Sequence, residues 1–318
     1  MPKKKSGQPP FEFTYVEELH SLPEQSLEYE VRLHGGFAVD KRSGRGQVYY
    51  GMPGCGIMRI SPDLTQQDVI ELPSELKPLN FHSTKIGEFD GKVRLFLPAD
   101  GGMKIAIISL EGEVEFVLPK PEFVEYLSDS SPFHPTDTTL VDGELFVADG
   151  YGSNYVSIAE LKSGKWTRKF GGKAGSPPEH GRFGTAHGMN LTPAGKELAI
   201  ADRPHSRLEL CGFDGRPLSS YALPAGSRPC GIDFAGIGGR FYAVVGSLDD
   251  PEEGRPAPIY ILDGETYQVL STIRAKEELG VELAVHLHNV VWHFHDGNTF
   301  LVCQAWNPGY YFVLQQVS

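Results

Sequence analysis

The chain has 318 residues, a formal net charge of −12 and 40% hydrophobic residues, enough apolar material for a large core. The negative charge disfavours a nucleic-acid partner, and the one basic run is confined to residues 3–5. No stretch approaches about 18 consecutive apolar residues, and no apolar segment follows the first basic residues, so we expect neither a membrane span nor a signal peptide. The four cysteines form no CxxC pair, which indicates reduced, mostly buried thiols in a cytoplasmic protein.

Short β-strands separated by tight turns dominate the predicted elements. The 37 glycines and 24 prolines exceed the average usage of about 12% for these two residues, and they favour a turn-rich all-β protein. Dipeptides such as Asp142-Gly143 and Asp296-Gly297 are typical of hairpin turns. In chain order we expect a weak helix at 23–29, a strand at 93–97, a weak helix at 120–127, strands at 144–148, 197–201 and 240–245, a weak helix at 275–282 and a strand at 299–303.

The chain repeats one unit six times. Segment 186–191 (AHGMNL), a turn and the strand 197–201 share a frame with segment 135–140 (PTDTTL) and the strand 144–148. The same frame fits 81–86 and 287–292, and two looser copies begin near residues 35 and 230. The spacing averages about 51 residues, which is typical of the blades of a β-propeller. We therefore predict an all-β, six-bladed β-propeller over residues 31–318, with residues 1–30 as a lead-in or as a strand that closes the ring.

Histidine occupies alternate units at one position of this frame, which we call the lead position. The six lead positions are Gly35, His82, Thr136, His187, Cys230 and His288. The first strand of a propeller blade runs beside the central channel, so three imidazoles from the second, fourth and sixth blades should converge on the axis. Three histidines with an open fourth position are typical of a catalytic zinc site, although other first-row metals also accept imidazole. The alternative for each histidine is a hydrogen-bonded core residue.

Two further side chains follow strands at comparable positions in adjacent units. Tyr151 could act as a general base or acid if a nearby cation lowers its pKa, and Arg203 could hold a carboxylate or stabilise a tyrosinate. The alternative is a surface tyrosine and a salt-bridged arginine. The preceding Asp149 and Asp202 are interpreted as turn or cap carboxylates. His134 and His286 are candidates for a substrate pocket, because His286 lies two residues before His288 and shares its strand face.

Segments 134–137 (HPTD), 145–154 (LFVADGYGSN), 181–188 (GRFGTAHG) and 201–203 (ADR) resemble NHL-type propeller repeats, and most of all peptidyl-α-hydroxyglycine α-amidating lyase. The resemblance is good over residues 130–215, fair near His82 and His288, and faint elsewhere. It implies a six-bladed propeller with a three-histidine zinc site, which cleaves an N-acyl hemiaminal to an amide and glyoxylate. Carried over by motif, it assigns His82, His187 and His288 as zinc ligands, Tyr151 as the catalytic tyrosine and Arg203 as its neighbour.

The chain departs from that family at four points. Gly152 and Leu210 stand where the family has cysteines, which fits a cytoplasmic relative without disulfides. Asn289 replaces an aspartate that the family uses for structural calcium, so calcium is disfavoured here. His286 replaces a methionine, and no arginine matches the one that grips the substrate carboxylate. A copper monooxygenase partner domain and a secretion signal are not evident.

The leading hypothesis from the sequence is a zinc-dependent carbon–nitrogen lyase acting on a small-molecule or peptide-like carboxylate substrate of the hemiaminal type. A metal would lower the pKa of the substrate hydroxyl, and Tyr151 would relay the proton. Two alternatives stay open. One is a propeller hydrolase such as a lactonase, whose calcium would need channel carboxylates rather than histidines. The other is a non-catalytic NHL-type binding propeller, which has no need of histidines on its axis.

Overall fold

Alternating side chains on single strands pack against two neighbouring sheets. In β12 (Glu144–Ala148), Leu145 and Val147 belong to one buried cluster, whereas Phe146 and Ala148 belong to the next. This follows from the period of two along a strand, because both faces of each blade are covered by other blades. The described residues form six such hydrophobic clusters, one between each pair of adjacent sheets.

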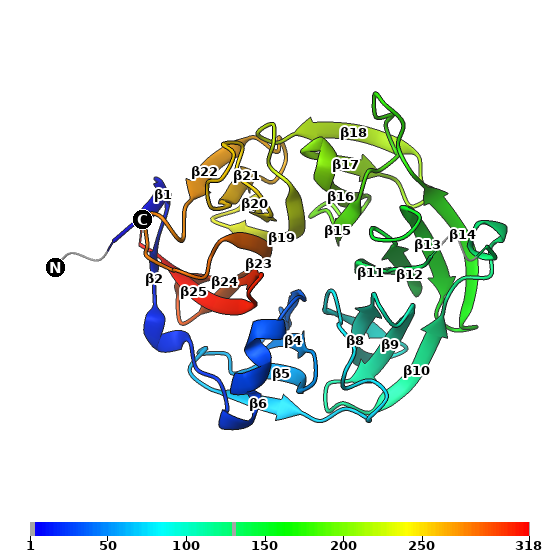
Figure 1. Ribbon diagram of the computed structural model, residues 1–318, viewed down its shortest axis with the longest axis horizontal. Helices are drawn as coiled ribbons and strands as arrows, with labels where there is room; N and C mark the ends of the chain where they lie inside the picture. The colour runs from blue at the N-terminus through cyan, green and yellow to red at the C-terminus, as the bar shows by residue number, and fades with distance from the viewer. Residues whose placement is uncertain (1–3, 129–131, 318) are drawn as a thin grey trace.

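The six sheets form a closed ring around a central axis, which confirms the predicted six-bladed β-propeller (Figure 1). The structure is a computed structural model that describes residues 4–128 and 132–317. Blade one contains β3 (Phe37–Val39), β4 (Val48–Met52), β5 (Gly56–Ile60) and β6 (Gln67–Ile70). Blade two contains β7 (Lys85–Phe89), β8 (Lys92–Ala99), β9 (Lys104–Ser109) and β10 (Val114–Pro119). Blade three contains β11 (Asp137–Val141), β12, β13 (Tyr155–Glu160) and β14 (Lys165–Gly171).

The second half of the ring has the same antiparallel order. Blade four contains β15 (Ala186–Leu191), β16 (Leu198–Asp202), β17 (Arg207–Cys211) and β18 (Pro217–Ala222). Blade five contains β19 (Pro229–Ile237), β20 (Arg240–Ser247), β21 (Ile259–Asp263) and β22 (Val269–Ile273). Blade six contains β23 (His286–His295), β24 (Asn298–Trp306), β25 (Tyr310–Gln316), β2 (Phe11–Tyr15) and β1 (Ser6–Gln8). The first strand of each blade lies nearest the axis (Figure 1).

The N-terminal strands complete the last blade and so close the ring. Strand β2 pairs with β25, with Phe13 opposite Gln316 and Tyr15 opposite Leu314. Phe11 and Phe13 are buried, and their rings lie 6.2 and 6.4 Å from the ring of Trp292. The N-terminal strands and the last strand therefore belong to one sheet (Figure 1).

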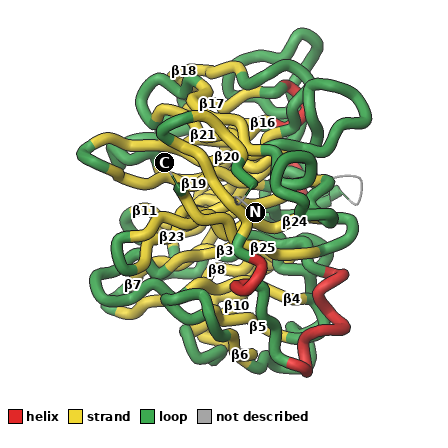
Figure 2. Tube along the Cα trace, turned by 90° about the vertical axis from the view of Figure 1, so that its left-hand side faces the viewer, coloured by secondary structure: helices red, strands yellow, loops and turns green. Residues whose placement is uncertain are grey.

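In the described part of the chain, helical structure is limited to short 3-10 helices among the strands (Figure 2). These are η1 (Glu17–Leu19), η2 (Glu24–Arg32), η3 (Val124–Tyr126) and η4 (Arg203–His205). The predicted segment at 23–29 falls in η2 and that at 120–127 contains η3, but the helix predicted at 275–282 is wrong, because these residues form turns. Gly280, at φ 81°, reverses the chain after a single turn. Within the described ranges, no helix is both long and apolar enough to cross a lipid bilayer.

Hydrogen bonds between blades fix the inner strands around the axis. Asp137 Oδ2 accepts from Met189 N at 2.8 Å, and Asp233 Oδ2 accepts from Trp292 N at 3.0 Å. Asn289 Oδ1 accepts from Phe37 N at 3.1 Å, across the junction of the last and first blades. Because each acceptor lies on one blade and each donor on the next, these buried bonds hold the lead positions at fixed places around the channel.

Candidate metal centre

Three histidines from alternate blades meet on the axis, as their lead positions predict. His82 precedes β7, His187 lies on β15 and His288 lies on β23, and each is only 2% exposed. Their ring centroids are 4.7, 4.8 and 4.6 Å apart for the pairs 82–187, 187–288 and 82–288. Three imidazoles bound to one tetrahedral zinc through nitrogens at about 2.1 Å have ring centres about 5 Å apart. The triangle therefore has the size of a three-histidine metal site.

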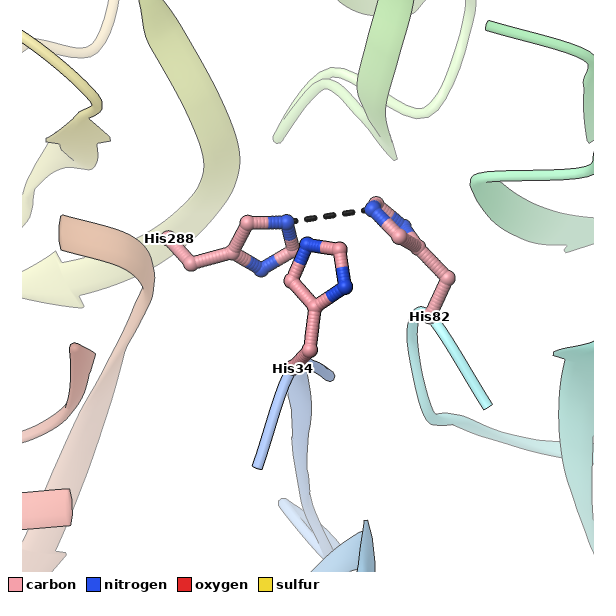
Figure 3. A group of neighbouring side chains, drawn as sticks. All are labelled: His34, His82 and His288. Atoms are coloured by element: carbon pink, nitrogen blue, oxygen red, sulfur yellow. Dashed lines mark hydrogen bonds between the residues drawn. The ribbon is translucent and has the colours of Figure 1, made fainter. Parts of the chain in front are cut away.

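Backbone carbonyls fix which nitrogen of two of these rings faces the axis. His82 Nδ1 lies 2.8 Å from Thr136 O, and His288 Nδ1 lies 3.4 Å from Gly35 O. A carbonyl can only accept, so each Nδ1 carries the proton and each Nε2 presents a lone pair. The two Nε2 atoms are 3.1 Å apart (Figure 3). Two nitrogen lone pairs at that distance repel each other unless a proton or a metal lies between them. The distance is close to the separation of about 3.3 Å between two nitrogens bound to one tetrahedral zinc.

The third imidazole presents the same nitrogen. Arg203 Nη2 donates to His187 Nε2, and a guanidinium has no acceptor atom, so this nitrogen also carries a lone pair. His187 Nδ1 then holds the proton, and it is a buried atom with no hydrogen-bond partner within the described ranges. All three histidines thus turn Nε2 toward the axis, and this is the nitrogen that zinc and other first-row metals accept. The lone pair of His187 Nε2 is taken by Arg203, so a metal at His187 would have to replace that hydrogen bond.

Burial keeps the three imidazoles neutral. Desolvation lowers the pKa of His82, His187 and His288 well below the ordinary value of 6.5, and the nearby Arg203 guanidinium adds to the effect on each. A metal ligand must be unprotonated, so the burial that lowers these pKa values also favours metal over protons at neutral pH.

Tyr151 and Arg203 lie beside this cluster. The Tyr151 hydroxyl is 3.1 Å from His187 Nε2 and accepts from Arg203 Nη1 at 3.1 Å. Arg203 Nη2 also lies 3.1 Å from the thiol sulfur of Cys230, at the fifth lead position. Burial raises the pKa of Tyr151, and Arg203 opposes that rise. The alternative of a surface tyrosine and a salt-bridged arginine does not hold, since Tyr151 is partly buried and Arg203 has no carboxylate partner within the described ranges.

Two buried carboxylates build the turns that carry this pair, as the sequence interpretation of Asp149 and Asp202 predicts. Asp149 accepts from His134 N at 2.6 Å, from Ser153 N at 2.7 Å and from the Tyr126 hydroxyl at 3.0 Å. Asp202 accepts from Gly184 N at 2.9 Å and pairs with Arg207 at 2.9 Å. These bonds fix each turn at the end of its strand and so aim the next side chains at the axis.

A fourth histidine, His34, reaches the same place and was missed from the sequence. Its ring centroid is 4.5 Å from that of His288 and 4.9 Å from that of His82, and Figure 3 shows the three side chains pointing toward one another. Ligand atoms of His34, His82 and His288 all lie within 4.8 Å of one another. Burial, and secondly Arg203, lower the pKa of His34 to about 4. The sequence signal that could have identified His34 is its position directly before Gly35, the lead residue of the first blade.

The two remaining site candidates lie outside the histidine cluster. His134 Nδ1 is 2.9 Å from Asp100 O, and the His134 carbonyl accepts from Tyr151 N at 3.3 Å, so His134 supports the tyrosine turn. His286 Nδ1 is 2.7 Å from Leu248 O, and its ring lies 6.2 Å from Trp306. It lines a cavity of about 580 Å³ together with Asp249, Asp250 and Arg255. The four cysteines are buried and free.

The fold and this site define a six-bladed β-propeller with a buried histidine cluster on its axis. Over 183 residues the chain is 27% identical to the peptidylglycine α-amidating monooxygenases of Mus musculus and Rattus norvegicus. The match covers 52% of this chain and only 19% of either relative. No protein-family profile matches the chain.

Solved structures with the same fold are more distant in sequence. Virginiamycin B lyase from Staphylococcus aureus, in a catalytically inactive form with quinupristin, is 14% identical with a TM-score of 0.53, over 87% of this chain and 78% of that one. A streptogramin B lyase is 13% identical with a TM-score of 0.53, over 98% and 97%. The Cps50 propeller domain of Myceliophteria thermophila is 12% identical with a TM-score of 0.54, over 89% and 83%. At such identities these structures show the fold alone.

Proposed function

We propose that this protein is a metal-dependent lyase, with zinc as the metal, that cleaves the carbon–nitrogen bond of a hemiaminal-type hydroxy acid. The observation that carries the proposal is the set of three buried imidazoles that turn Nε2 toward the axis, beside a hydrogen-bonded tyrosine–arginine pair. The partial identity to the amidating monooxygenases supports a catalytic role. A zinc ion held by His82, His187 and His288 would supply a Lewis acid that lowers the pKa of a substrate hydroxyl.

Tyr151 is the residue placed to move the proton. As a tyrosinate it takes the proton of the substrate hydroxyl, the C–N bond breaks while the C=O bond forms, and the leaving nitrogen takes the electron pair. The same phenol then gives its proton to that nitrogen, so the products are an amide and an aldehyde. Arg203 stabilises the tyrosinate through its 3.1 Å bond to the phenol oxygen.

Arg203 also indicates the substrate's charge. Its guanidinium is 8% exposed and, among the residues that the structure describes, bonds only the neutral groups of Tyr151, His187 and Cys230. A buried cation without an anionic partner is unfavourable, so an anion that enters the site gains the full interaction. We infer that the substrate carries a carboxylate, as an N-acyl or ureido α-hydroxy acid does.

The calcium-dependent lactonase alternative has little support in the channel. Two aspartates on the inner strands of this protein already form ion pairs with lysines. Lys41 lies 2.7 Å from Asp233, and Lys85 lies 3.3 Å from Asp137. Asn289 accepts a hydrogen bond from Phe37 N, but its neutral amide does not supply the negative charge of the aspartate that the resembled family has at this position. Calcium prefers several free carboxylate oxygens, so these contacts favour a histidine-bound metal over calcium.

Metal analysis of protein purified without a tag or chelator tests the proposal, beside the triple variant His82→Ala/His187→Ala/His288→Ala. We expect about one zinc per chain, its loss in the triple variant, and an unchanged β circular-dichroism spectrum. N-acyl-α-hydroxyglycine and ureido-hydroxy acids then serve as substrates, with aldehyde release as the readout.

Three outcomes would contradict the proposal. A triple variant that keeps the metal would remove the assigned site. Calcium as the sole metal would favour the hydrolase alternative, and a protein with no metal affinity would favour the binding propeller.

A further inference from the structure

The cluster on the axis holds one imidazole more than the proposed reaction uses. His34 reaches it from the segment between η2 and β3, not from a blade strand. Its ring centroid lies 4.5 Å from that of His288 and 4.9 Å from that of His82, close to the 4.6, 4.7 and 4.8 Å between the three blade histidines. A zinc that binds three histidines has one position left. Ligand atoms of His34, His82 and His288 all lie within 4.8 Å of one another, and their side chains point toward one another (Figure 3).

Asn80 supplies the outer contact that a metal-bound histidine needs. Its amide nitrogen lies 3.4 Å from His34 Nδ1, and its amide oxygen is buried without a hydrogen-bond partner within the described ranges. Half a turn of the amide brings the oxygen to Nδ1, where it accepts that proton. His34 Nε2 then presents a lone pair to the cluster, as the Nε2 atoms of His82 and His288 do.

The surroundings of His34 allow it to leave. The imidazole is partly exposed, whereas His82, His187 and His288 are each 2% exposed. It stacks on Trp306 at 5.0 Å and lies nearly parallel to Tyr151 at 6.4 Å. Its departure opens a slot between two aromatic rings, of a shape that suits a planar amide or ureido group beside the metal.

We propose that His34 is a fourth, exchangeable metal ligand that closes the site in the resting protein and that the substrate displaces. The inference rests on the proposed metal centre. The three blade histidines hold the metal permanently, while His34 competes with the substrate for the remaining position. Asn80 is a positioning residue for His34.

Cobalt substitution tests this without measuring activity. The wild-type, His34→Ala and His286→Ala proteins are loaded with Co²⁺, and visible spectra are recorded across pH 6–9 and during titration with thiocyanate. In the wild type we expect a spectrum independent of pH and weak thiocyanate binding. In His34→Ala a bound water replaces the imidazole, so the spectrum changes as that water ionises, and thiocyanate binds at least about 10-fold more tightly. His286→Ala is the matched control, because it removes a nearby imidazole outside the cluster and should behave as the wild type.

Identical pH and thiocyanate titrations for the wild type and His34→Ala would overturn the proposal. Complete loss of Co²⁺ from His34→Ala would also overturn it, because a ligand that the substrate displaces cannot be required to retain the metal. Failure of the metal centre itself has a different signature, in which the triple variant of the blade histidines binds Co²⁺ as the wild type does.

Discussion

Two buried arginines that are close in sequence should respond in opposite ways to removal of their charge. Arg203 and Arg207 are each 8% exposed. Arg207 lies 2.9 Å from Asp202 and 3.0 Å from Glu209, both fully buried. Arg203 has only neutral partners, and its Nε is buried without a partner among the described residues. We therefore expect Arg203 to serve the proposed reaction and Arg207 to stabilise the fold.

The expected magnitudes follow from these partners. Arg203→Met loses three hydrogen bonds worth about 1.5 kcal/mol each, but it removes an uncompensated buried charge that costs several kcal/mol. We expect the free energy of unfolding of the metal-free protein to stay unchanged or to rise by up to about 3 kcal/mol. Arg207→Met leaves two buried carboxylates without their cation and should lower it by about 3–5 kcal/mol.

Urea denaturation in the presence of a chelator at pH 7 measures both changes. Lyase activity of the folded, metal-loaded Arg203→Met protein should fall by at least about 100-fold, because the variant cannot stabilise the tyrosinate. The reasoning is refuted if Arg203→Met destabilises the protein as much as Arg207→Met does. That result would mean that the guanidinium beside Tyr151 holds the blades together.

Three further predictions concern the tyrosine, its turn and the ring closure. Tyr151→Phe should lower kcat by about 10²- to 10⁴-fold with zinc content unchanged, and loss of zinc would assign the phenol to the metal instead. Burial raises the pKa of Asp149 to about 6, above its unfolded value near 3.8, so its contribution stabilises the fold at low pH and is lost as pH rises through that window. Between pH 4.5 and 7, the free energy of unfolding of the wild type should therefore fall by about 2 kcal/mol relative to that of Asp149→Asn. Parallel plots of this free energy against pH for the two proteins would contradict a raised pKa of Asp149. Phe11→Ala should cost about 3–5 kcal/mol in the same assay, and a cost below about 1 kcal/mol would show that β2 does not close the ring.

The blades could be predicted from the sequence because the alternation of side chains along each strand determines most of the packing between sheets. The alternation of Leu145, Phe146, Val147 and Ala148 between two clusters is visible in the printed residues, and so is the recurrence of the frame. The helix at 275–282 failed because Gly280 reverses the chain after one turn, and a weak apolar pattern does not reveal that reversal.

For the site, the sequence identified three of the clustered histidines, but it did not show how their side chains are arranged. The frame placed His82, His187 and His288, since lead positions map directly onto the axis. His34 escaped because it belongs to the connecting segment before Gly35, and only the folded path of that segment carries its ring to the cluster. The choice of Nε2 as the inward nitrogen depends on carbonyls of other blades, which no pattern of residue types specifies.

The pairing of β2 with β25 has a consequence for assembly. The proposed ligands belong to blades two, four and six, and the last of these blades is complete only when the N-terminal strand β2 docks beside the final strand β25. During synthesis, His82 and His187 emerge long before His288 can stand opposite them. Tight metal binding would then occur late in folding, after the ring of blades has closed. A chain released before its last strands were made would lack the complete set of histidine ligands.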